Sequence, residues 1–230
     1  MFPVFTSDRF GVPLPPQHRF PIRKYGLLRR ALLDEGVLRE AQLREPEAAG
    51  FETLCLAHAS GYVRAVLDGT LDGAGLRRLG FPWSRELVER ARRSVGGTLA
   101  AAAAALDSGV AGNLAGGTHH AHAGCGSGFC TFNDVAVAVR ALRGTGRFRR
   151  ALVVDLDVHQ GDGTARIFAE DPDTFTFSVH GAHNFPFRKA ASDLDVPLPD
   201  GTDDGGYLAA LERCLPQAWE RARPEIVFYL

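Results

Sequence analysis

The sequence predicts an α/β fold in which a mainly parallel sheet is flanked by helices. Extended and helical patterns alternate along the chain, which is typical of βαβ units. A strand is predicted at residues 151–156 (ALVVDL), because 151–154 form an apolar run of the kind expected of a strand buried on both faces. A length of 230 residues, with 45% hydrophobic and 23% charged residues, suits one large domain with a sizeable core. We therefore expect a single domain over residues 1–230.

The first half of the chain favours helices. A short strand is predicted at residues 4–5, and a helix at 25–33 should close near Gly36. Apolar and polar residues alternate over 51–56, which predicts a strand. Helices follow at 60–67 and 84–106, the second with Ser84 as its N-cap and an alanine run that favours helix.

The second half alternates more regularly between strand and helix. The predicted elements are a strand at 110–115 ending in Gly116 and Gly117, a helix at 132–142 capped by Asn133 or Asp134, strands at 151–156 and 174–179, a helix at 206–221 and a strand at 226–230. Residues 180–204, rich in Pro, Gly and Asp, should be the longest irregular stretch. An apolar strand at the very end of the chain suggests a domain cut before its end.

Charge and cysteine content exclude several classes of function. Lys and Arg number 26 and Asp and Glu 27, so the net charge of −1 supplies no field for binding nucleic acid or an anionic membrane. No signal peptide and no spanning segment of about 20 apolar residues is evident. The four cysteines form no CxxC pair, which fits a reducing compartment. We expect a cytoplasmic protein; its oligomeric state is left open.

Polar side chains gather where the predicted strands end, which is where open α/β sheets bind ligands. Six of the eight histidines follow strand ends. His119, His120 and His122 follow the strand at 110–115, Asp155, Asp157 and His159 follow the apolar run, and Ser178, His180 and His183 follow the strand at 174–179.

Asp157 and His159 form a D-x-H pair. On an extended segment residues i and i+2 share a face, so both side chains can reach one cation. A carboxylate and an imidazole suit zinc better than calcium or magnesium. The alternative is an acid and a histidine that merely satisfy loop backbone, but Asp155 and Asp162 add carboxylates of the kind that orient catalytic imidazoles.

His119 and His120 are adjacent, so their imidazoles converge only if the chain turns, and Gly116 and Gly117 permit that turn. Such a pair can divide the work of general base and electrostatic partner. The alternative is two loop histidines in ordinary hydrogen bonds. Further on, Gly128 would let Phe129 line a narrow apolar slot, the alternative being a plain helix-entry turn with a core phenylalanine.

Three ordered motifs resemble the zinc-dependent histone deacetylase superfamily, in particular its bacterial and class IV members. They are GGTHHA at 116–121, GFCTFND at 128–134 and VDLDVHQGDGT at 154–164, accompanied by HRFPIRKY at 18–25 and VPLPDG at 196–201. The resemblance covers nearly the whole chain. It implies an arginase/deacetylase fold and hydrolysis of an N-acyl amide such as acetyl-lysine, in a peptide or a small acetylated amine.

The resemblance also implies a role for each site residue. It makes Asp157 and His159 zinc ligands, His120 the general base and then acid, and His119 its electrostatic partner. Asp155 would hold His119 and Asp162 would hold His120. The remaining implied residues are tunnel walls at Gly128, Phe129 and Phe185, and a site for a monovalent cation at Asp155, Asp157, His159, Ser178 and the Val179 carbonyl, with a weaker one near Phe168. Potassium is the candidate ion.

The chain departs from the family pattern at two points. The family's third metal ligand is an aspartate just after the strand that residues 226–230 resemble, and an oxyanion-binding tyrosine comes later; neither falls within these 230 residues. A catalytically incomplete fragment, or an inactive member that binds acylated ligands, is therefore the alternative. A two-manganese ureohydrolase is disfavoured, because Gly161 stands where D-x-H-x-D needs its last aspartate. The acyl length and the amine are left open.

Overall fold

The computed structural model describes residues 2–230, and the chain divides into two compact units, Met1–Leu142 and Arg143–Leu230. We call them the N-terminal unit and the C-terminal unit. The expected single domain over 1–230 stays a prediction. No helix among the described residues is both long enough and apolar enough to cross a bilayer.

The N-terminal unit has a small parallel sheet in the order β2-β1-β3. Its strands are β1 (Val4–Phe5), β2 (Leu43–Arg44) and β3 (Gly112–Asn113), each two residues long. The strand at 4–5 is confirmed, the one predicted at 110–115 shrinks to β3, and β2 was not predicted. Pairs this short carry no readable periodicity; they form because distant segments meet.

Helices make up most of the N-terminal unit. They are α1 (Lys24–Asp34), α2 (Phe51–Cys55), α3 (Ser60–Asp68), α4 (Gly73–Leu79), α5 (Arg85–Ser108) and α6 (Asp134–Gly144), with a 3₁₀ turn at Glu40–Gln42; the last residues of α6 enter the C-terminal unit. Ser84 caps α5 as predicted, since its Oγ accepts a hydrogen bond from the Leu87 amide at 3.0 Å. Asn133 is the cap of α6, because its Oδ1 accepts from the Ala136 amide at 2.9 Å.

The strand predicted at 51–56 is wrong, because this segment forms the helix α2 (Phe51–Cys55). Phe51 and Leu54 are three residues apart, and Ala57 follows three residues later just beyond the segment, so these letters also fit a helical face. Leu54 and Ala57 are buried, and the Leu54 amide donates to the Gly50 carbonyl at 3.0 Å. Burial on one helical face therefore decided between two patterns that the short window could not separate.

Gly96 lies in the middle of α5, where the backbone of residues 47–49 passes very close. A Cβ added at this position would stand 1.8 Å from the Glu47 carbonyl oxygen. The approach is held by the Ala49 amide, which donates to the Arg92 carbonyl at 3.0 Å, and by Arg92 Nε, which donates to the Ala49 carbonyl at 2.8 Å. A glycine inside this helix is therefore required by packing against residues 47–49.

We expect Gly96→Ala to lower the free energy of unfolding by about 3 kcal/mol, because the new methyl group would force backbone apart. Denaturant titration would measure the change. Gly61→Ala is the matched control, since a Cβ at that helical glycine of α3 meets nothing within 4 Å. It should shift stability by less than about 1 kcal/mol. Equal effects of the two substitutions would contradict the close approach.

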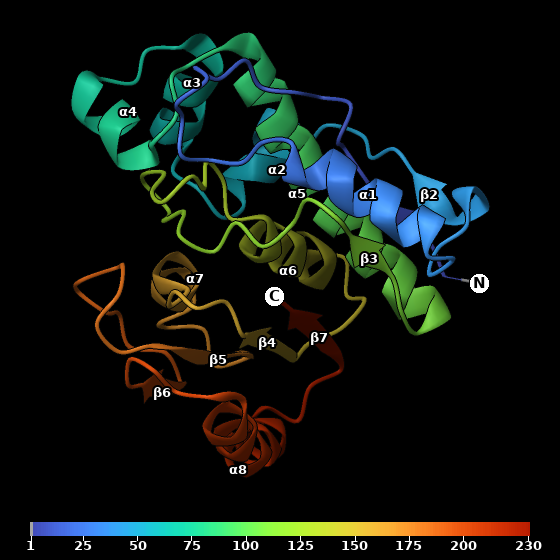
Figure 1. Cartoon of the computed structure of the whole chain (residues 1–230), viewed down its shortest axis with the longest axis vertical. Coiled ribbons are helices and arrows are strands. Elements are labelled where there is room, and N and C mark those ends of the chain that lie inside the picture. Colours follow the sequence, from blue (N-terminus) through green and yellow to red (C-terminus); the bar gives the residue numbers. More distant parts are fainter. Residues whose placement is uncertain (1) are drawn as a thin grey trace. The chain divides into compact units, whose positions relative to one another are not determined.

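The C-terminal unit is a four-stranded parallel sheet in the order β6-β5-β4-β7, with α8 packed on one face (Figure 1). Its elements are β4 (Ala151–Asp155), α7 (Asp162–Ile167), β5 (Thr174–Gly181), β6 (Leu194–Leu198), α8 (Asp204–Ala222) and β7 (Ile226–Tyr229). Leu152 and Phe177 of the sheet pack with Ala210 and Ala218 of α8 in one buried cluster. The predicted parallel α/β fold is confirmed.

The stretch 180–204, expected to be irregular, contains the edge strand β6. It pairs in parallel with β5, with Val196 opposite Val179 and Pro197 opposite His180. Proline cannot donate to a ladder and usually argues against a strand, but an edge strand tolerates it. The pairing partner decided the conformation here, because the local composition of these residues favours a loop.

Candidate functional site

The predicted site residues form two groups, one in each unit. His119, His120, Gly128 and Phe129 lie in the N-terminal unit. Asp155, Asp157, His159, Asp162, Ser178, Val179 and Phe185 lie in the C-terminal unit.

His119 and His120 lie side by side at the buried centre of a loop, residues 117–123, which we call the histidine loop. The two residues are 5% and 4% exposed, and their ring centroids are 4.1 Å apart with the planes tilted by 48°. Gly117 adopts φ of +83°, the left-handed conformation that glycine allows. The turn needed to bring adjacent imidazoles together is therefore present.

Asp134, at the start of α6, holds the beginning of the histidine loop. Its fully buried carboxylate accepts hydrogen bonds from the amides of Gly117 at 3.0 Å and Thr118 at 2.8 Å. The hydroxyl of Thr98 on α5 donates to it at 2.5 Å. The sequence suggested Asp134 only as a possible helix cap. Its role in holding the loop is visible only once residues 98, 117 and 134 are brought together.

His58 holds the end of the same loop. Its Nδ1 lies 2.9 Å from the His122 carbonyl oxygen, and its Nε2 accepts from the Asn133 amide at 2.9 Å. The ring is 3% exposed. Burial lowers the pKa of His58 from 6.5 to about 4, although the hydrogen bond to the His122 carbonyl opposes this shift. His58 is therefore a neutral imidazole with both nitrogens occupied, and sequence reasoning missed it.

This depressed pKa predicts acid sensitivity of the fold. Between pH 6.5 and about 4 the unfolded chain binds a proton at His58 that the folded chain does not, so stability rises with pH across that window. Acidification from pH 7 to pH 4 should thus cost about 3 kcal/mol at this residue. Denaturant titrations at several pH values would measure the slope, which should fall by about one proton in His58→Gln. An unchanged slope would contradict this prediction.

Gly128 and Phe129, the predicted tunnel residues, have positive φ values of 53° and 66°. Their amides donate to the carbonyls of Arg78 at 3.3 Å and Leu79 at 2.8 Å. The Phe129 ring packs against Phe20 and Phe81, both at 5.3 Å between centroids. A cluster of aromatic rings therefore fixes Phe129 in an unusual backbone conformation, so its orientation is set by packing.

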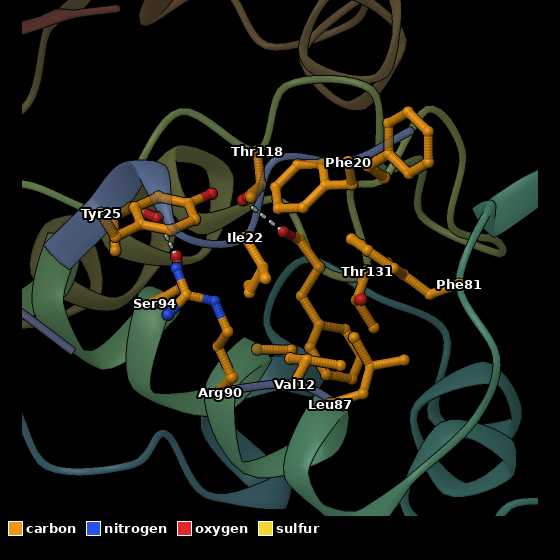
Figure 2. Close-up of a pocket in the computed structure, with 14 residues that line it drawn as sticks. Val12, Phe20, Ile22, Tyr25, Phe81, Leu87, Arg90, Ser94, Thr118 and Thr131 are labelled. Atoms are coloured by element: carbon orange, nitrogen blue, oxygen red, sulfur yellow. Dashed lines mark hydrogen bonds between the residues drawn. The ribbon is translucent and has the colours of Figure 1, made fainter. Parts of the chain in front are cut away.

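A small cavity of about 40 Å³ adjoins this cluster (Figure 2). Its walls include Phe20, Phe81 and Thr118, together with the buried Arg90, whose guanidinium lies 3.9 Å from the Tyr25 ring centre. The Thr118 hydroxyl donates a hydrogen bond to the Phe132 carbonyl at 2.6 Å. The cavity has room for only a few water-sized molecules.

In the C-terminal unit, Asp155 ends β4 and Asp157 and His159 follow it in a bend. Asp155 is 3% exposed, and its Oδ1 accepts from the Asp157 amide at 3.1 Å. Asp157 Oδ1 accepts from the His159 amide at 2.8 Å and lies 2.9 Å from His159 Nδ1. The D-x-H side chains do converge, but through a turn beyond the strand end and not through strand alternation.

These two side chains suit a metal ion as partial ligands. Within residues 2–230 no three His, Cys, Asp or Glu side chains are arranged as a metal-binding group. The donor atoms of Asp157 and His159 nevertheless stand 2.9 Å apart, near the separation of about 3.4 Å between two ligands of a tetrahedral zinc ion. Both side chains are partly exposed, at 46% and 41%. The pair therefore offers an accessible carboxylate and imidazole to one cation.

The loop that carries Phe185 is tied to the same strand end. Asn184 Nδ2 donates to the Val158 carbonyl at 2.5 Å, and Lys189 Nζ donates to the Asn184 carbonyl at 3.0 Å. The Phe185 ring stands edge-on to the His159 ring with 6.2 Å between centroids. Phe185 is thus held beside a predicted zinc ligand, as a tunnel wall would be.

Gln160 is a further residue that sequence reasoning missed. It follows His159 directly and is fully buried. Its Oε1 accepts from the Ala190 amide at 2.7 Å, and its Nε2 donates to Asp195 Oδ1 at 2.8 Å. Gln160 therefore connects the segment carrying His159 to residue 190 and to β6.

The remaining predicted residues lie in buried positions of the same unit. Ser178 is opposite Asp155 in the β4–β5 register, and its Oγ lies 2.9 Å from His180 Nδ1. Val179 is fully buried on β5, and Asp162, 6% exposed, begins α7. The implied pairs Asp155–His119 and Asp162–His120 stay predictions.

Comparison with known proteins identifies relatives across nearly the whole chain. The family model described as the histone deacetylase domain matches residues 18–230. An uncharacterized protein of Picosynechococcus sp. is 48% identical over 228 residues, which are 99% of this chain and 76% of that protein. Histone deacetylase 2 of Arabidopsis thaliana is 29% identical over 222 residues, 92% of this chain and 57% of its own length.

A solved structure agrees with these sequence relatives. The crystal structure of an HDAC homologue from Aquifex aeolicus superposes with a TM-score of 0.83 at 26% identity. The match covers 99% of this chain and 67% of the Aquifex chain. The present chain thus spans a little over half of the Arabidopsis relative and about two thirds of the Aquifex homologue.

Proposed function

Because the chain belongs to the histone deacetylase family, we propose that it hydrolyses the N-acyl amide of acetyl-lysine or a related acetylated amine with the help of one zinc ion. The observation that carries this proposal is the buried pair of imidazoles, His119 and His120, with 4.1 Å between ring centroids. Two imidazoles held this close in a buried position can share the work of proton transfer and charge stabilisation.

In the proposed reaction a water molecule adds to the amide carbon and the C–N bond breaks, releasing acetate and the free amine. Zinc held by Asp157 and His159, with a further ligand, would polarise the carbonyl and acidify the water. His120 takes the proton of the attacking water and then delivers it to the leaving nitrogen. His119 stabilises the charge on its neighbour. Asp155 and Asp162 are proposed to orient this pair.

The proposed substrate tunnel is lined by Gly128, Phe129 and Phe185. The aromatic packing of Phe129 against Phe20 and Phe81 supports a rigid wall, and the loop bonds around Asn184 support a fixed position for Phe185. An apolar tunnel suits a neutral acylated lysine better than a free ammonium.

We also propose a structural potassium ion. Its ligands would be Asp155, Asp157, His159, Ser178 and the Val179 carbonyl. The register that sets Asp155 opposite Ser178 supports such a site, because both polar side chains are buried at neighbouring strand ends. We propose a cytoplasmic location as well. It is supported by the cysteines, since none of Cys55, Cys125, Cys130 and Cys214 is joined in a disulfide within residues 2–230.

Acetate release from an acetyl-lysine peptide and from an N-acetylated polyamine would test the function. We expect hydrolysis of at least one of them, lost after chelation and restored by one equivalent of zinc. Binding of the acetylated probes without acetate release would contradict the proposal and favour an inactive binding protein. Restoration that needs two manganese ions would point to a ureohydrolase-like centre instead.

A further inference from the structure

We propose that His58 is a positioning residue for the histidine pair: it joins the histidine loop to the first turn of α6 and so sets the geometry of His119 and His120. This inference rests on the proposed function for its catalytic consequence. Its structural part concerns the N-terminal unit alone.

The hydrogen bonds fix the tautomer of His58. The Asn133 amide can only donate, so Nε2 of His58 must be the acceptor of that 2.9 Å bond. The proton therefore sits on Nδ1, which donates to the His122 carbonyl at 2.9 Å. Among the uncharged side chains, an imidazole presents a donor and an acceptor on opposite sides of one rigid ring.

The neighbours of His58 bond to the same short stretch of loop. The Ala59 amide donates to the Ala123 carbonyl at 2.8 Å, and Asn133 Nδ2 donates to the Ala121 carbonyl at 3.3 Å. The successive carbonyls of Ala121, His122 and Ala123 thus each accept a hydrogen bond from His58 or one of its neighbours.

Asp134 holds the opposite end of the loop through the Gly117 and Thr118 amides. His119 and His120 lie between these two sets of bonds. Because Asn133 and Asp134 are adjacent, both ends of the loop are hydrogen-bonded to residues at the start of α6. His58, which lies between α2 and α3, bonds both to the end of the loop and to Asn133.

The ring of His58 is itself fixed by packing. It lies 5.9 Å from the Tyr62 ring and 5.4 Å from the Phe132 ring, and the Tyr62 hydroxyl donates to the Thr131 carbonyl at 2.6 Å. The low pKa keeps the ring neutral at physiological pH, so the acceptor at Nε2 persists. Position, tautomer and charge of His58 are all determined by its surroundings.

The test compares His58→Ala, His58→Asn and His58→Gln in the whole protein. Asn places an amide donor near the position of Nδ1, whereas Gln places an acceptor near the position of Nε2. Val66→Ala is the control, since Val66 is a buried residue of α3 whose apolar side chain makes no hydrogen bond to the histidine loop. The measurements are kcat, KM, the melting temperature and amide hydrogen exchange of residues 117–123 in metal-free protein.

We expect His58→Ala to lower kcat at least tenfold with KM changed less than twofold, and to speed exchange in residues 117–123 at least tenfold. His58→Asn should recover most of both losses, and His58→Gln should not. Wild-type kcat and exchange in His58→Ala would overturn the inference, as would an equal loss of kcat in Val66→Ala at an equal melting temperature.

Failure of the proposed function would be recognised separately. If the wild-type protein released no acetate from any acetylated probe, the proposed function would fail. The exchange of residues 117–123 in metal-free protein would then still decide whether His58 holds the loop.

Discussion

His120→Ala is expected to lower kcat about 1,000-fold, because the proposed proton acceptor and donor is removed and no replacement side chain is provided. The side chain is 4% exposed and stands against His119 at 4.1 Å between ring centroids, so bulk water cannot readily take its place. The bonds from Asp134 to the histidine loop should keep the loop folded in the variant. Single-turnover acetate release would measure the loss.

His183→Ala is the matched control for this substitution. His183 is an exposed histidine, 77% accessible in its side chain, in the loop after β5. Its removal should leave kcat within a factor of two of the wild type. Zinc content should be unchanged in both variants. A His120→Ala protein that retains more than a tenth of wild-type kcat would remove His120 from the proposed proton-transfer role.

Replacing both Asp157 and His159 by alanine is expected to abolish zinc binding and, with it, acetate release. The wild-type protein should hold about one zinc ion per chain when purified without chelator. The two donor atoms stand 2.9 Å apart, close enough for both side chains to reach one cation, and the double substitution removes this carboxylate–imidazole pair. Elemental analysis of the purified proteins gives the stoichiometry directly.

The chain offers a second Asp–His pair as a control. His183 Nδ1 lies 3.9 Å from Asp200 Oδ1, and both side chains are largely exposed. The double variant His183→Ala, Asp200→Ala should keep its zinc and its activity. If wild-type protein and the Asp157, His159 double variant bound the same amount of zinc, these residues would not be its ligands.

Several elements could be predicted because their signals are local. The sequence pattern of β4 is a run of consecutive apolar residues. The helices α5 and α8 are long enough for their helical pattern to repeat over several turns. The short elements β2 and α4 could not be predicted. β2 is two residues long, and in the seven residues of α4 two glycines weaken the helical signal.

The candidate site shows the same division. The motifs around His119, His120, Asp157 and His159 could be recognised in the sequence, because the residues that resemble the family are adjacent along the chain. The residues that hold these motifs in place could not be predicted. His58 bonds to a residue 75 positions away, Asp134 to one 36 away and Gln160 to one 35 away.

The sequence by itself determined the parallel α/β class, the long helices, the family and the identity of the paired histidines and the D-x-H pair. Only the tertiary structure decided that residues 51–55 are helical, that Pro197 sits in an edge strand, and that His58, Asp134 and Gln160 hold the two groups of site residues. The physical reason is that periodicity and adjacent motifs are properties of short segments. Buried hydrogen bonds and close approaches, in contrast, require partners that are distant in sequence and meet only in the folded chain.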